Sequence, residues 1–100
     1  MVLSVKEVVK YYSATINSPS IINGSKLYPV KARIVKLVGE NDHYWYEVCS
    51  HYKKSKQEEP YTTSIGGHSI ESAERSLIKY LEEFQQALLD GGEVVPNPYY

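Results

Sequence analysis

The sequence has few of the residues that build disulfide networks, metal sites or membrane spans. Its 100 residues include one cysteine, Cys49, so no internal disulfide can form, and its three histidines are scattered. Without Cys/His ligand spacing, we expect neither a metal site nor a cofactor. No apolar run approaches the roughly 20 residues that a membrane span needs, and no hydrophobic signal segment follows Met1. The expected protein is therefore cytoplasmic and makes no membrane contact.

A charge excess of one sign is also missing. The chain carries 11 basic and 12 acidic residues, which gives a net charge of −1. Without a global basic field, any nucleic-acid site would have to be local. The length corresponds to a single domain with one modest core. We place this α+β domain at residues 1–92 and expect residues 93–100, which are short and rich in proline, to form an extended C-terminal tail.

No group of residues has the spacing of a catalytic site. Cys49 and His51 would share one face of a strand, but two positions along a strand is a poor geometry for a nucleophile and its base. The serines and acidic residues near the C-terminus form no paired constellation. We therefore expect a non-catalytic protein with no evident small-molecule substrate.

Residues 65–90 predict a long amphipathic helix. Apolar residues recur there at helical spacing while charged residues lie off the stripe, which comprises Ile70, Ala73, Leu77, Leu81, Phe84 and Leu88. Ser69 is placed to cap the helix, and Gly91 can supply the left-handed residue that ends it.

A second helix is expected near the N-terminus. Ser4 and Glu7 form a Ser-x-x-Glu capping box, and the apolar face would comprise Val5, Val8, Val9 and Tyr12. Residues 17–26 are rich in Asn, Ser, Pro and Gly, so we expect a loop there.

Three strands are expected between the two helices. Residues 28–38 are rich in β-branched residues, residues 43–52 alternate in character, and residues 60–65 make a shorter Tyr-Thr-Thr strand. Tight connections make the sheet antiparallel, and we expect the side with Tyr46 and Val48 to meet the helices. The predicted fold is α-β-β-β-α, with a three-stranded sheet covered on one face by both helices.

This order resembles the double-stranded-RNA-binding domain. Gly39, Asp42 and His43 are similar to the loop between that family's first two strands, and Gly66, Gly67, Ser69 and Ala73 are similar to its approach to the last helix. The chain departs from the family's pattern where Ile70 and Glu71 replace a lysine pair and Glu74 replaces a further lysine. Because such lysines meet phosphates, their replacement indicates a weakened RNA clamp.

Two surfaces are candidates for nucleic-acid binding. The resemblance implies that His43 reaches a minor groove and that Gly67, His68 and Ser69 offer a helix N-terminus to phosphate. The basic residues Lys10, Lys31 and Arg33 could add backbone contacts, or Lys31 and Arg33 could join the aromatic residues of the sheet to stack a single strand. RNA is therefore a candidate partner.

Protein contact is the favoured alternative. The chain has ten tyrosines, a residue that combines large contact area with one polar handle. The expected protein interface comprises Tyr44, Trp45 and Tyr46 on the sheet, and Leu88 where the helical stripe outruns the sheet. We expect a small protein-interaction or adaptor module, either a homodimer or one partner of another protein, with a degenerate RNA-binding surface.

Overall fold

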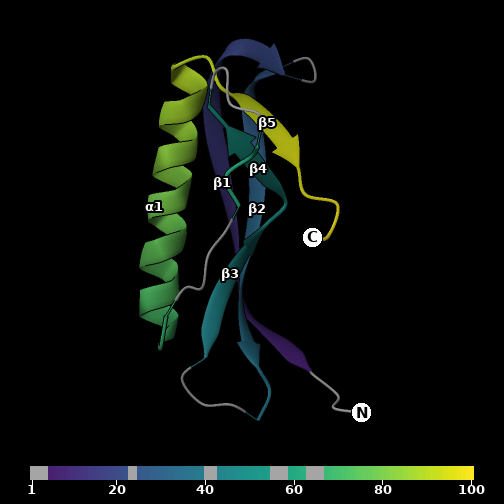
Figure 1. Cartoon of the computed structure of the whole chain (residues 1–100), viewed down its shortest axis with the longest axis vertical. Helices are drawn as coiled ribbons and strands as arrows, with labels where there is room; N and C mark the ends of the chain where they lie inside the picture. Colours follow the sequence, from purple (N-terminus) through teal and green to yellow (C-terminus); the bar gives the residue numbers. More distant parts are fainter. Residues whose placement is uncertain (1–4, 23–24, 40–42, 55–58, 63–66) are drawn as a thin grey trace.

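A computed structural model of the chain describes residues 5–22, 25–39, 43–54, 59–62 and 67–100. The elements are β1 (Lys6–Ile22), β2 (Ser25–Leu37), β3 (Tyr44–Val48), β4 (Ser50–Lys53), α1 (Ile70–Leu89) and β5 (Glu93–Pro96). The first three strands form an antiparallel sheet in the order β1-β2-β3, and β4 pairs with β5 in a second antiparallel sheet. Figure 1 shows α1 running along one side of the strands.

The expected N-terminal helix is wrong. Lys6–Ile22 is a 17-residue strand that pairs with β2 as the first arm of a long hairpin. Valine, tyrosine, threonine and isoleucine dominate this segment, and such residues fit a pleated surface better than a helix. Ser4 of the capping box lies outside the described residues. The loop expected over 17–26 is also wrong for Asn17–Ile22 and for Ser25 and Lys26, which are strand residues.

The strand expected at residues 28–38 is confirmed within β2. Val30, Ala32 and Ile34 alternate onto the buried face, which we call the inner face because α1 covers it. Pro29 lies opposite Thr15 in the ladder with β1. β3 pairs with β2 only from Ala32 onward, so the missing N–H of Pro29 faces no strand partner.

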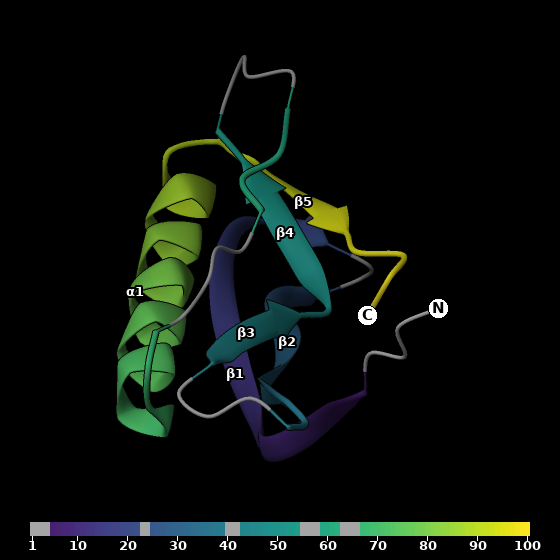
Figure 2. The same cartoon turned by 60° about the horizontal axis from the view of Figure 1, so that its bottom comes forward.

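The strand expected over residues 43–52 divides at Cys49. β3 pairs with β2, whereas β4 turns away and pairs with β5 (Figure 2). At the break the Cys49 N–H donates to the Lys31 carbonyl at 2.9 Å, and the Cys49 Sγ accepts from the Lys31 N–H at 3.1 Å. The Tyr46 and Val48 side does face the helix, as predicted.

The partner of β4 comes from the C-terminal segment. Residues 93–100 were expected to be an extended tail, but Glu93–Pro96 form β5 and Asn97 donates from its side chain to the Val48 carbonyl at 2.9 Å. The strand expected at 60–65 is reduced to one bridge between Tyr61 and Tyr52, and residues 63–66 lie outside the described part.

These observations correct the fold. The described residues contain five strands in two antiparallel sheets and one C-terminal helix, so the α-β-β-β-α order is wrong. Among the described elements, α1 is the one helix that covers the inner face, and Tyr52 of β4 and Val94 of β5 pack against the same core.

The helix itself is confirmed, with Ser69 as its cap. Ser69 Oγ accepts from the Ser72 N–H at 3.1 Å, and Gly91 follows the helix with φ of 92°. Its buried stripe comprises Ala73, Leu77, Tyr80, Phe84, Ala87 and Leu88. These side chains form one hydrophobic core with Ile16 and the inner residues of β2, β3 and β4.

Replacing Phe84 by alanine tests this packing. Phe84 is 0% exposed and packs against the rings of Tyr52 and Tyr80, so Phe84→Ala should lower the free energy of unfolding by about 3–5 kcal/mol. Leu89→Ala is the matched control because Leu89 is 54% exposed, and its cost should be within about 0.5 kcal/mol. Urea denaturation followed by circular dichroism measures both, and equal costs for the two variants would contradict the packing described.

Candidate functional site

The structure brings His43 close to Gly67. Residue Tyr44, which follows His43, exchanges two backbone hydrogen bonds with Gly67, each 3.1 Å long. The His43 ring lies edge-on to Trp45, with 5.6 Å between centroids. The Gly67 N–H and the Ser72 N–H at the start of α1 already have acceptors inside the chain. The start of α1 therefore does lie near His43, but the Gly67 N–H of the predicted cluster is engaged within the chain. Asp42 and Gly66 lie outside the described residues, and His68 is exposed.

The predicted basic residues divide between the two faces of the sheet, with Lys31 and Arg33 on one face and Lys10 on the other. Lys10 lies on β1 and its Nζ is 2.9 Å from Glu74 of α1. Tyr12 also donates to that carboxylate. Hydrogen bonds from Tyr12 and Lys10 lower the pKa of Glu74. Arg33 alternates with Ala32 and Ile34, so it lies on the opposite, outer face of the sheet.

Arg33 belongs to a closed charge network on this outer face. Its Nε lies 2.7 Å from Glu47 Oε1, while Lys6 Nζ lies 3.1 Å from Glu47 Oε2. Trp45 Nε1 donates to the same carboxylate at 3.3 Å. The Tyr100 ring covers Arg33 at 4.2 Å, and its carbonyl accepts from Arg33 at 3.1 Å. Arg33 and Lys6 therefore share one carboxylate, and Arg33 is partly covered by Tyr100, which makes Arg33 less available to phosphate.

The pKa of Glu47 reflects this network. Partial burial acts to raise it, but hydrogen bonds from Arg33, Lys6 and Trp45 outweigh that cost and lower it from the usual 4.5. Because the folded-state pKa is depressed, the stabilisation is present above about pH 4.5 and is lost as the pH falls through the folded-state value.

Two of the four expected interface residues serve the core. Tyr46 is 3% exposed and Leu88 is 1% exposed, so neither side chain is available to a partner of the folded chain. Tyr44 is half-buried and packs against the same core. Trp45 is half-buried on the outer face beside Glu47.

The free edge of β1 is a feature that the sequence pattern did not identify. Asn17 donates its N–H to Gln85 Oε1 at 2.8 Å and accepts from Gln85 Nε2 at 2.6 Å, so its backbone groups point away from β2. The register with β2 is unbroken from Lys10 to Asn17. By alternation, the N–H and C=O groups of Tyr11, Ser13 and Thr15 also point outward. Among the described residues, these groups have no hydrogen-bond partner.

A groove of about 420 Å³ runs between this edge and α1. Its lining is mainly apolar and comprises Ala14, Thr15, Ile16, Ile78, Leu81, Glu82 and Gln85. Ile78 is an apolar residue of the groove, and 48% of its surface is exposed. An unpaired strand edge beside an apolar groove is the geometry of strand addition.

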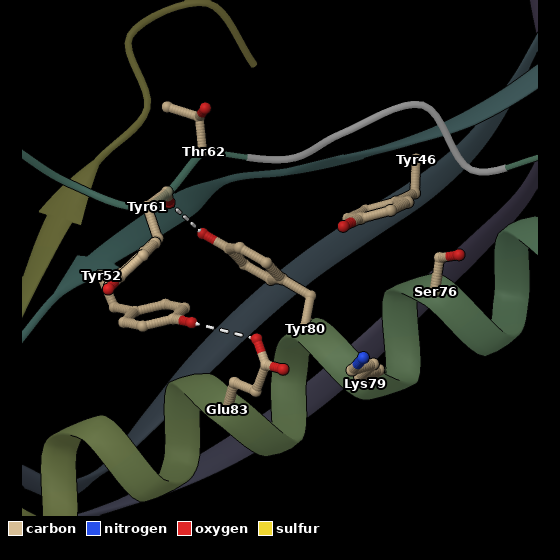
Figure 3. Close-up of a pocket in the computed structure, with 8 residues that line it drawn as sticks. All are labelled: Tyr46, Tyr52, Tyr61, Thr62, Ser76, Lys79, Tyr80 and Glu83. Carbon is tan, nitrogen blue, oxygen red and sulfur yellow. Dashed lines mark hydrogen bonds between the residues drawn. The ribbon is translucent and has the colours of Figure 1, made fainter.

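A second cavity, of about 300 Å³, is lined by tyrosines and lies on the other flank of α1. Figure 3 shows Tyr46, Tyr52, Tyr61 and Tyr80 around it. Tyr80 donates to the Tyr61 carbonyl at 2.6 Å, and Tyr52 donates to Glu83 at 3.5 Å. Burial raises the pKa of Tyr52 to about 12 and also raises the pKa of Tyr80, so both phenols stay protonated at neutral pH.

Comparison with models of known protein families, with curated proteins and with solved structures finds no match. In the described part of the chain no group of His, Cys, Asp and Glu side chains could hold a metal ion. The same residues include no helix with the length and apolarity to cross a membrane.

Replacing Glu47 by glutamine tests the outer-face network. Glu47→Gln removes a charge that Arg33 and Lys6 share, and should lower the free energy of unfolding at pH 7 by about 1–3 kcal/mol. The variant should also lose less stability than the native chain between pH 5 and pH 3, since the carboxylate that titrates is gone. Urea titrations at several pH values measure both effects, with Glu59→Gln as an exposed control. Parallel pH profiles for the native chain and Glu47→Gln would contradict the stabilising role of Glu47.

Proposed function

We propose that this protein is a non-catalytic protein-interaction module that pairs with a second copy of itself along β1. The observation that carries the proposal is the outward-pointing backbone of Tyr11, Ser13 and Thr15 beside the apolar groove. Edge strands of this kind accept another strand unless something blocks them. Symmetric pairs are also the commonest oligomers of soluble proteins.

Antiparallel pairing centred on Ser13 satisfies the free backbone groups of both copies. It sets Ser13 against the partner's Ser13 and Tyr11 against the partner's Thr15, so outward-pointing residues meet each other. The two sheets would then form one continuous sheet, and Ile78 would lose water-exposed apolar surface at the centre of the contact.

The same register is favoured by charge. It sets the partner's Lys10 opposite Ile16, and Ile16 shares the groove with Glu82. Paired residues on neighbouring strands point to the same sheet face, so the ammonium group would approach this carboxylate. Within the described residues Glu82 is exposed and makes no ion pair. Lys10 already pairs with Glu74 of its own chain, so the partner's Glu82 would be a second carboxylate beside this ammonium group.

Gln85 sets one end of this contact. Its side-chain amide bonds both backbone groups of Asn17 and so occupies the edge where a longer partner strand would continue. At the other end, the register between β1 and β2 shifts by one residue between Val8 and Lys10. The free edge is thereby limited to the few residues around Ser13, which favours a closed pair over an open-ended stack.

The geometry gives less support to binding of double-stranded RNA or a single strand. Lys10 and Arg33 are paired with Glu74 and Glu47, and they lie on opposite faces of the sheet. We also propose a cytoplasmic location, since Cys49 is a free, half-buried thiol of the kind that persists in reducing compartments.

Sedimentation equilibrium tests the pairing. The native chain should form a concentration-dependent dimer, and Ile78→Glu should weaken it by about tenfold or more because a charge enters the apolar contact. Ser13→Pro should weaken it similarly, because it removes an outward N–H while leaving the ladder with β2 intact. Leu89→Glu is the matched control, since Leu89 is exposed on the same helix but does not line the groove.

Exchanging the charges of Lys10 and Glu82 tests whether the two copies pair in the register centred on Ser13. Glu82→Lys should weaken the dimer, and adding Lys10→Glu should restore part of the loss, although the new carboxylate also repels Glu74 of its own chain. A native chain that stays monomeric at about 1 mM, or a Leu89→Glu effect equal to that of Ile78→Glu, would refute the proposed surface.

A further inference from the structure

The hydroxyl of Tyr46 opens into the tyrosine-lined cavity, where solvent reaches it. Tyr46 is 3% exposed, yet its hydroxyl makes no hydrogen bond with any described residue. Figure 3 shows this hydroxyl ending in the open space of the cavity, with Ser76 and Lys79 on the helix across from it. Because this hydroxyl is open to the cavity and bonds to no described residue, a ligand in the cavity can reach it.

Two opposite charges line the same cavity one helical turn apart. Lys79 makes no ion pair within the described part of the chain, and no salt bridge joins it to Glu83. Glu83 accepts one hydrogen bond, from Tyr52 at the long distance of 3.5 Å. Residues four apart on a helix can pair with each other, so their separation leaves both charges available to a bound molecule.

The remaining wall is aromatic. The rings of Tyr52 and Tyr61 lie 5.2 Å apart between centroids, and Tyr52 is also 5.2 Å from Tyr80. Phenol rings offer apolar area to a ligand side chain and a negative face to a cation. The volume of about 300 Å³ fits a molecule the size of a free amino acid and falls at the lower end of ligand sites.

We propose that this cavity binds a small zwitterion with an apolar side chain, of the class of free α-amino acids. The carboxylate lies against Lys79 Nζ and the Tyr46 hydroxyl, and the ammonium group lies against Glu83. The side chain packs on the tyrosine rings. A zwitterion uses both unpaired charges at once, whereas a simple anion leaves Glu83 as a repulsive neighbour and a simple cation leaves Lys79 as one.

This site is independent of the self-pairing proposed for β1. The groove is lined from α1 by Ile78, Leu81, Glu82 and Gln85, and the cavity by Ser76, Lys79, Tyr80 and Glu83. At 3.6 residues per turn these two sets fall on opposite flanks of the helix. Loss of one activity therefore leaves the other measurable.

Titration of the ¹⁵N-labelled chain tests the proposal. The probes are L-phenylalanine and L-leucine, together with N-acetyl-L-phenylalanine, which lacks the ammonium group, and L-phenylalaninamide, which lacks the carboxylate. The free amino acids should give saturable shifts at the residues that line the cavity, and each blocked derivative should bind about tenfold more weakly or worse. No saturable shift for either amino acid up to about 10 mM, or equal binding of the N-acetyl derivative, would overturn the zwitterion site.

Three variants localise the binding. Lys79→Met, Glu83→Gln and Tyr46→Phe should each lower the affinity for the amino acid by about tenfold. All three should keep the fold, and Tyr46→Phe preserves the buried ring. Arg75→Met and Glu71→Gln are the matched controls, because both residues are exposed on α1 and neither lines the cavity. Unchanged affinity in Lys79→Met and Glu83→Gln, or an equal loss in the controls, would place the binding elsewhere.

Discussion

Burial of one helical stripe against one sheet face is the constraint on which the rest of the structure depends. Phe84 and Leu77 of α1 fill the space above Val30 and Ile34, and β4 extends the same core with Tyr52. With a single helix available, the outer face needs another cover. Part of that cover comes from the chain itself, where Tyr100 stacks on Arg33 and Trp45 donates to Glu47. The edge of β1 and the two flanks of α1 are what this arrangement leaves exposed.

Local pattern predicted the elements whose periodicity is unambiguous. The stripe of residues 70–89 has a clear helical period, and Val30, Ala32 and Ile34 alternate, so both elements were found. The N-terminal segment misled because its apolar residues Val5, Val8, Val9 and Tyr12 fall at the spacing of one helix face. The register shift between Val8 and Lys10, which fits them to a strand, has no signal in the local sequence. Pairing with β2 makes the N-terminal segment a strand instead of a helix. Pairing with β5 likewise separates β4 from β3. Both pairings join segments that are far apart in the sequence.

The candidate sites were also hard to predict, because they depend on contacts between distant parts of the sequence. Tyr44, which follows His43, pairs with Gly67, but Lys10 and Arg33 lie on opposite faces once β1 is a strand. Tyr46 was predicted as an aromatic contact residue and Leu88 as apolar length beyond the sheet, but both side chains lie in the core. The groove and the tyrosine cavity each combine α1 with distant strands, so no window of sequence contains them. The count of ten tyrosines was the one sequence feature that indicated an aromatic site, and it did not indicate where that site lies. The two proposed sites lie on opposite flanks of one helix and differ in chemistry, with a free strand edge on one side and two opposite charges on the other.

Amide hydrogen exchange measured at two protein concentrations tests most directly whether β1 is an edge strand that pairs with a second copy. In dilute solution the N–H groups of Tyr12, Ala14 and Ile16, which bond to β2, should exchange slowly, while those of Tyr11, Ser13 and Thr15 should exchange fast. At high concentration the second set should become protected and the alternation should disappear. Uniform protection of the segment at both concentrations, or an alternation that persists at the highest one, would contradict this account.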